Sequence, residues 1–168
     1  MQRPAGILLA AFLCLPASAR QAADDRAPPP DQLPSGAAEK FVSVSHAAPA
    51  AKITVVTQVL AIRETGPKET VERFGETFAF DPSVLIAHRD EPTLITFRNL
   101  RPDDMHDFLL VDPSSATLMH VMLPALRDVS YTLAFHEEGL FRFYCTMHQP
   151  VMSGQILVLP PRHDPGRG

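Results

Sequence analysis

A thiol, an imidazole and a thioether occur within eight residues near the end of the chain, in the segment Cys145-Thr146-Met147-His148-Gln149-Pro150-Val151-Met152. An alternating apolar run that contains Phe141 and Phe143 precedes this segment, and a second apolar run, residues 154–159, follows it. Such alternation is typical of β-strands, so the segment is predicted to be a loop between two strands. Cysteine, histidine and methionine are ligands that soft transition metals accept, and the loop is therefore a candidate metal site.

Copper electron-transfer sites combine two His and one Cys in a trigonal arrangement with a weak axial Met. Cys145, His148 and Met152 supply three of these four ligands, so one His must come from another segment. The candidate is His106, because alternation places it on the same strand face as Phe108 and Leu110. An imidazole on an apolar face needs a hydrogen-bond partner or a metal. The alternative for His106 is an ordinary hydrogen-bonded core residue.

The first residues have the organisation of a secretory signal peptide. Arg3 gives a positive start, residues 6–15 are apolar but too short to span a bilayer, and Ala17-Ser18-Ala19 fits a small-residue cleavage site. We therefore expect residues 1–19 to be a signal peptide that is removed, which makes the mature protein periplasmic or secreted and leaves it no membrane span. The alternative is an uncleaved membrane anchor.

Cleavage would change the cysteine count. Of the two Cys, Cys14 would leave with the leader and only Cys145 would remain. A lone Cys cannot form an internal disulfide, and in an oxidising compartment a bound metal is the simplest use for it. The alternative is an inert buried thiol.

Composition and charge limit the possible partners. The 168 residues are 45% hydrophobic and 20% charged, as is ordinary for one globular domain. The net charge is −4, and it becomes 14 minus 19, or −5, without Arg3. This balance argues against nucleic acid and anionic membrane surfaces as partners. We expect a monomer.

The remaining sequence predicts an all-β domain between flexible ends. Residues 20–52 are rich in Ala and Pro and are expected to be a flexible linker, residues 53–160 to form the domain, and residues 161–168 to be a loose tail. Residues 114–124 have weak periodicity and are expected to hold a short helix or an irregular crossover. Strands separated by turn signals indicate an antiparallel β-sandwich. The predicted strands are residues 53–62, 71–80, 84–87, 93–99, 105–111, 130–135, 140–145 and 154–159.

Several segments resemble the cupredoxins, the family of small type 1 (blue) copper proteins that includes plastocyanin, pseudoazurin, amicyanin and azurin. Residues 141–148 match the signature F-x-F-x-C-x-x-H, and Met152-Ser153-Gly154 matches the M-x-G that follows it. Residues 78–84 resemble an early strand of bacterial members, and residues 96–108 resemble the strand and loop that bring the first His. The resemblance covers residues 53–159. It implies a Greek-key, cupredoxin-like β-sandwich with one copper ion, cycling between Cu(I) and Cu(II), bound by His106, Cys145, His148 and Met152.

Two features depart from the pattern of this family. Three residues separate His148 from Met152, whereas plastocyanin-like loops usually have four and amicyanin has two. Asp107 stands where many members have Asn. Its carboxylate is expected to accept a hydrogen bond from Thr146 and, as a negative charge near the metal, to lower the reduction potential.

The resemblance implies an electron carrier rather than an enzyme, because the four ligands leave no open position for a substrate. A redox partner is expected to dock on a small apolar patch formed by Met147, Pro150 and Val151 around His148. The alternative function is periplasmic copper storage, delivery or resistance. A second, weaker Cu(I) site formed by Met119, His120 and Met122 would suit that alternative, although Met in such a segment also serves simply to fill a core.

Overall fold

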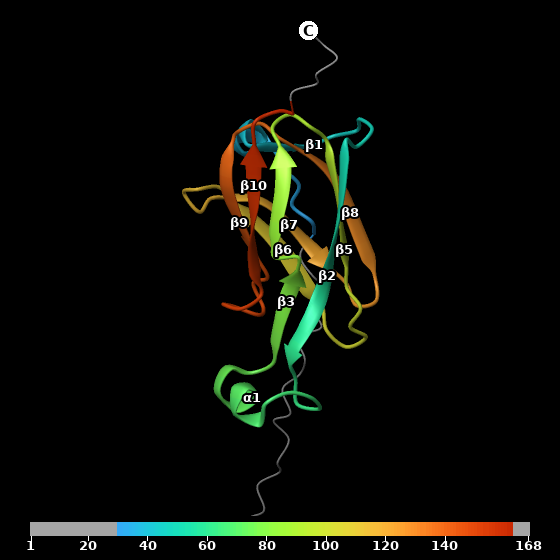
Figure 1. Cartoon of the computed structure of the whole chain (residues 1–168), viewed down its shortest axis with the longest axis vertical. Coiled ribbons are helices and arrows are strands. Elements are labelled where there is room, and N and C mark those ends of the chain that lie inside the picture. Colours follow the sequence, from blue (N-terminus) through green and yellow to red (C-terminus); the bar gives the residue numbers. More distant parts are fainter. Residues whose placement is uncertain (1–29, 163–168) are drawn as a thin grey trace, which may run out of the picture.

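The computed structural model describes residues 30–162 and shows a sandwich of two five-stranded sheets (Figure 1). The first sheet has the strand order β1-β8-β5-β2-β3 and the second the order β4-β10-β9-β6-β7. The elements are η1 (Gly36–Lys40), β1 (Val42–Val44), β2 (Ala51–Ala61), α1 (Lys68–Phe74), β3 (Thr77–Asp81), β4 (Val84–His88), β5 (Thr93–Arg98), β6 (His106–Val111), β7 (Thr117–Leu123), β8 (Asp128–Phe135), β9 (Gly139–Tyr144) and β10 (Ser153–Leu159).

The predicted two-sheet β-sandwich is confirmed, with one refinement of its strand directions. Six of the neighbouring pairs are antiparallel, whereas β2 pairs with β5 and β4 pairs with β10 in parallel. The first parallel pair arises because the chain leaves one sheet after β3, adds β4 to the other sheet, and returns as β5 beside β2. Crossing between sheets in this way is the mark of Greek-key connectivity.

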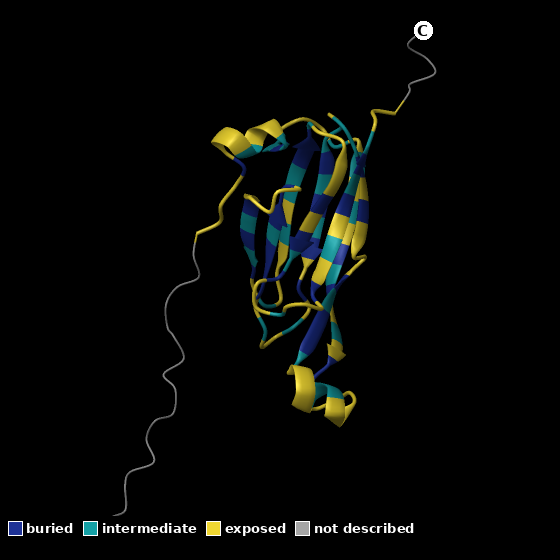
Figure 2. Ribbon diagram, turned by 90° about the vertical axis from the view of Figure 1, so that its left-hand side faces the viewer, coloured by how far each residue is buried: buried dark blue, intermediate teal, exposed yellow. Residues whose placement is uncertain are grey.

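The core between the sheets is rich in phenylalanine. In most strands buried residues alternate with more exposed ones (Figure 2), as period-2 geometry predicts, whereas β6 is buried at five of its six positions. Phe80 contacts Phe143, and Phe97 contacts Phe108, across the space between the two sheets, with ring centroids 5.3 and 4.4 Å apart. Burying one such ring stabilises the fold by roughly 1.5–3 kcal/mol. These rings lie directly behind the strand ends that carry the candidate ligands.

The N-terminal part of the domain differs from the prediction. Residues 20–52 were expected to be a flexible linker, but from residue 36 onward this stretch contains η1, β1 and the start of β2. Val42, in β1, is fully buried and pairs with Phe135 of β8. In the sequence, β1 is only the three residues Val42–Val44 between segments rich in Ala and Pro, and an alternation this short does not identify a strand. The predicted signal peptide, Cys14, residues 20–29 and residues 163–168 of the predicted tail lie outside the described residues.

Residues 71–80 do not form the single predicted strand. The chain forms helix α1 first and begins β3 only at Thr77, because Gly75, with φ of +76°, ends the helix in a conformation that favours glycine. The segment with α1 projects beyond the ends of β2 and β3 (Figure 1), and most of the helix is exposed (Figure 2). Among residues 30–162, no helix is long and apolar enough to cross a membrane.

Residues 114–124, expected to be a short helix or an irregular crossover, contain strand β7, which pairs with β6. The pairing shifts register near Leu118, so that both Leu118 and Met119 are buried. This bulge breaks the alternation that would otherwise have identified the strand.

Candidate metal centre

Three of the four predicted ligands lie where strands of one sheet end or begin, and His148 lies in the loop between β9 and β10. His106 is the first residue of β6, Cys145 directly follows β9, and Met152 directly precedes β10. The loop between Cys145 and Met152 is closed by two backbone hydrogen bonds. Cys145 N–H donates to Met152 O (2.9 Å) and Met152 N–H donates to His148 O (3.1 Å). The antiparallel pairing of β9 with β10 therefore fixes both ends of this loop.

Three of these side chains converge on one point. Nδ1 of His106 lies 3.1 Å from Nδ1 of His148, and Sγ of Cys145 lies 3.5 Å from the same His148 nitrogen. All three ligand atoms lie within 4.8 Å of one another. Met152 is fully buried beside them and is bonded through its backbone to Cys145 and His148. The cluster thus combines one residue of β6 with residues of the loop between β9 and β10.

The surroundings of this cluster are apolar. His106 and Cys145 are fully buried, and the ring of Phe78 lies 4.9 Å from that of His106 and 4.5 Å from that of His148. Only one proton fits between the two facing Nδ1 atoms, and Nε2 of His106 is buried with no hydrogen-bond partner among residues 30–162. Polar groups buried in this way are costly unless something binds them. Two imidazoles and a thiol with a neighbouring thioether fit copper better than zinc.

Burial also sets the protonation of the three side chains. It lowers the pKa of His106 to about 4, with repulsion from His148 adding to the effect, and it lowers the pKa of His148 as well. Burial raises the pKa of Cys145 to about 12. In the metal-free protein at neutral pH both imidazoles are therefore neutral, as ligands must be, whereas a metal would have to displace the thiol proton.

The metal-free protein is expected to lose stability as the pH falls from about 6.5 to about 4. In this range the unfolded state binds a proton at His106 that the folded state resists, because the folded pKa is the lower one. The contribution of His106 to the free energy of unfolding is complete above its ordinary pKa of 6.5. It is lost as the pH falls through the pKa of about 4 in the folded state. It amounts to at most about 3 kcal/mol. Urea unfolding of the wild type and His106→Gln at pH 7 and pH 4.5 measures it, and equal losses in both proteins would contradict the assignment.

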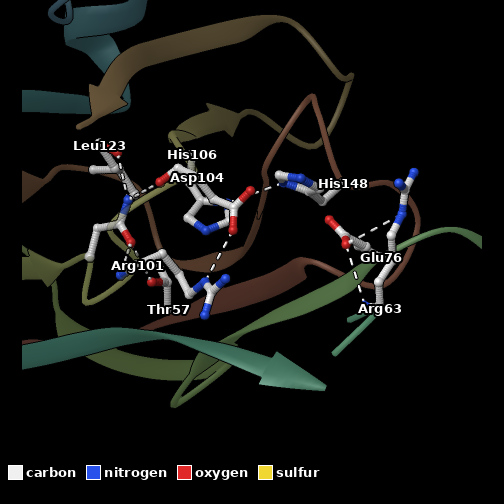
Figure 3. Close-up of polar contacts among 9 residues, drawn as sticks. Thr57, Arg63, Glu76, Arg101, Asp104, His106, Leu123 and His148 are labelled. Carbon is white, nitrogen blue, oxygen red and sulfur yellow. Dashed lines mark hydrogen bonds and ion pairs between the residues drawn. The ribbon is translucent and has the colours of Figure 1, made fainter. Parts of the chain in front are cut away.

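Asn99 holds the loop before His106 in place. Its side-chain oxygen accepts hydrogen bonds from the Thr57 hydroxyl (3.0 Å) and the Arg101 N–H (3.0 Å), and its amide donates to Asp104 O (2.8 Å) and Leu123 O (3.0 Å). The Arg101 guanidinium also pairs with the Asp104 carboxylate at 3.0 Å (Figure 3). Strands from both sheets are thus tied together beside His106. Sequence reasoning did not find this network, because the bonds of Asn99 to Thr57 and Leu123 join segments that are distant along the chain.

Asp107 joins the two ligand-bearing segments, and its expected contact with Thr146 is present. Oδ1 of Asp107 accepts the Thr146 N–H (2.6 Å), and Oδ2 accepts the Thr146 hydroxyl and Nε2–H of His120 (2.8 Å). Burial raises the pKa of Asp107, but the hydrogen bonds from Thr146, His120 and Cys145 outweigh it and hold this pKa below its ordinary value. The carboxylate is therefore ionised at neutral pH.

Met119 faces away from the other two residues of the predicted second copper site, and copper binding by His120 and Met122 stays a prediction. Met119 is fully buried in the core, whereas His120, the next residue along β7, points to the other face and bonds to Asp107. Adjacent side chains of a strand face opposite ways, so Met119 cannot join His120 and Met122 around one ion. The interpretation of Met119 as a core-filling residue fits this arrangement.

The predicted docking residues lie at the surface beside His148. Met147 and Val151 are 45% and 41% exposed, and His148 is half-buried. A groove of about 720 Å³ adjoins His148, Pro150 and Val151. Its other wall includes residues of α1 and was not predicted, because the helix was not foreseen. The groove is lined by Leu60, Ala61, Pro67, Thr70, Arg73, Phe74, Glu76, Thr77, His148, Gln149, Pro150 and Val151.

Neither protein-family models nor curated proteins yield a match to the sequence. Solved structures do resemble the fold. Auracyanin B matches with a TM-score of 0.53 and 18% identity over 72% of this chain and 99% of its own. Amicyanin from Paracoccus versutus (TM-score 0.44, 15% identity, 71% and 98% covered) and a purple cupredoxin from Nitrosopumilus maritimus (0.41, 18%, 64% and 99%) are also similar. At these identities the likeness concerns the fold alone. The likeness to auracyanin B, together with the strand topology, shows that the chain has the cupredoxin fold implied by its sequence motifs.

Proposed function

We propose that the protein is an exported type 1 copper protein that binds one copper ion through His106, Cys145, His148 and Met152 and carries single electrons between redox partners. The observation that carries this proposal is the convergence of two Nδ1 atoms and one Sγ within 4.8 Å in a buried apolar pocket. The ion would supply a one-electron couple between Cu(I) and Cu(II).

The residues around the site favour a geometry that changes little between the two oxidation states. Backbone hydrogen bonds close the loop from Cys145 to Met152, and Phe78 packs against both imidazole rings. The ligand positions are therefore fixed by the sandwich rather than by the metal. A preformed site of this kind costs little reorganisation, which is what fast electron transfer requires.

Electrons would enter and leave through His148, the half-buried ligand imidazole. The partner would dock on the surface around it, which includes the exposed side chains of Met147 and Val151 and extends along the groove to Leu60 and Phe74. An apolar surface suits a transient complex, because a partner can bind to it without forming strong ion pairs. With four protein ligands no position stays open for a substrate, so we propose a carrier and not an enzyme.

Copper storage or delivery is the competing function, and copper stoichiometry separates the two. The exported protein is loaded with copper, freed of excess metal, and examined by metal analysis and voltammetry. We expect one copper per chain and a reversible one-electron wave that persists over repeated cycles. Met122→Leu, which changes a thioether outside the four ligands, should behave in the same way. Two or more tightly bound ions, or loss of copper on reduction, would contradict the electron-carrier proposal.

A further inference from the structure

The contact between His120 and Asp107 has no place in the ligand set, and it reaches the site from another strand. Asp107 follows the ligand His106 in β6, and its carboxylate binds Thr146, which follows the ligand Cys145. One side chain thus bridges the two segments that must hold the metal. The side chain of Asp107 is only 3% exposed, so its charge is poorly screened by water.

His120 supplies a further donor to this carboxylate, beside those of Thr146 and the Cys145 thiol. Its Nε2 lies 2.8 Å from Oδ2 of Asp107, and an ionised carboxylate only accepts, so this nitrogen carries a proton. The backbone of His120 is itself held on both sides. His120 stands opposite Leu109 in the β6–β7 pairing, and its backbone exchanges two hydrogen bonds with Gln32 on its other side (2.7 and 2.8 Å).

The arrangement has a direct electrostatic consequence. An anionic carboxylate beside the metal favours the more positive Cu(II) and so lowers the reduction potential. Each hydrogen bond to the carboxylate withdraws part of that charge and fixes the direction of the oxygens. Removing His120 would take one donor away from Oδ2, and the carboxylate would be both less compensated and freer to turn away from Thr146.

We propose that His120 is a positioning residue of the metal site, which acts through Asp107 to order the Cys145 loop and to raise the reduction potential above the value that the bare carboxylate would impose. This inference rests on the proposed function. Unlike a surface ion pair, the His120–Asp107 contact has one almost fully buried partner, and that partner also bonds the ligand loop. A change at His120 can therefore affect the metal ligands through Asp107, which a change in an exposed ion pair cannot do.

The test compares three variants of similar side-chain size. His120→Leu removes the donor, and His120→Gln keeps an N–H that can reach the carboxylate. His136→Leu is the matched control. His136 directly follows β8, and its Nδ1 lies 2.7 Å from Oδ1 of Asp90. This end of β8 is the one farther from the metal site. Circular dichroism establishes that each variant is folded.

Two readouts are measured. In the copper-loaded protein, equilibration with a redox dye should show His120→Leu displaced toward Cu(II) by about tenfold, equivalent to about 59 mV for one electron. In the metal-free protein, hydrogen exchange of the Thr146 amide should be faster by about the same factor, because its acceptor is less well held. His120→Gln should restore most of both values, and His136→Leu should change neither.

The inference is overturned when His120→Leu and His136→Leu have the same dye equilibrium and the same Thr146 exchange rate. Failure of the proposed function looks different. A wild-type protein that binds no copper would refute the electron-carrier proposal, while the exchange of Thr146 in the metal-free protein would still decide whether His120 positions the loop.

Discussion

Replacing Cys145 by serine is expected to abolish the visible absorption of the copper-loaded protein. The intense colour of a type 1 site arises from charge transfer between a thiolate and copper, and Cys145 is the free cysteine of the described chain. A serine hydroxyl has nearly the same shape but stays protonated at neutral pH and is a poor ligand for copper. We expect copper affinity to fall by more than about 100-fold, beyond the range seen for residues outside the ligand set.

The loss should be chemical rather than structural. Cys145 is fully buried, and an isosteric replacement there is expected to lower the free energy of unfolding of the metal-free protein by only about 1 kcal/mol. Copper titration followed by absorption, together with urea unfolding, separates the two effects. Met147→Leu, in the same loop but 45% exposed, is the matched control and should keep the band. A Cys145→Ser protein that kept an intense visible band would show that the thiolate is not the source of the colour.

Replacing Gly154 by alanine is expected to be strongly destabilising. A Cβ atom at this position would overlap the ring of Phe143 in the paired strand β9 and the backbone oxygen of Ser83. The Ser83 oxygen cannot move away freely, because it accepts the Gln155 N–H at 2.8 Å. The phenylalanine ring is fully buried in the core and has no free space. We expect the free energy of unfolding to fall by about 3 kcal/mol, the upper part of the range for overpacked cores.

The same substitution should disturb the metal site. Gly154 lies two residues after Met152, so the shift that relieves the overlap moves the end of the ligand loop. We expect lower copper affinity as well as a lower urea midpoint. Gln155→Ala, an exposed position on the same strand, is the control and should change the stability by less than about 0.5 kcal/mol. A Gly154→Ala protein as stable as this control would contradict the close packing of β10 against Ser83.

The parts of the site that could be predicted are those encoded locally. Cys145, His148 and Met152 stand in one loop, and the alternation of Phe141 and Phe143 identifies the strand before it. His106 could be predicted with a weaker signal. Alternation places its imidazole on the same strand face as Phe108, and an imidazole is unusual on an apolar face. The structure places His106 against His148, as that reasoning requires. Metal binding by His106, Cys145, His148 and Met152, and the identity of the metal, stay predictions.

The features that escaped prediction depend on non-local pairing or on a single residue. Helix α1 is separated from β3 by one glycine, Gly75, whose conformation the apolar pattern does not reveal. Strand β7 was hidden by the bulge near Leu118. The bond between His120 and Asp107 follows from the register of β6 against β7, which becomes known only once both strands are placed.

The visible absorption spectrum of the protein, titrated with Cu(II) and then treated with ascorbate, tests the central claim most directly. The convergence of His106, Cys145 and His148 predicts an intense thiolate-to-copper band that saturates at one equivalent and bleaches reversibly on reduction. A protein that stays colourless with Cu(II), or that takes up Cu(I) beyond one equivalent, would contradict a type 1 site and with it the electron-carrier proposal.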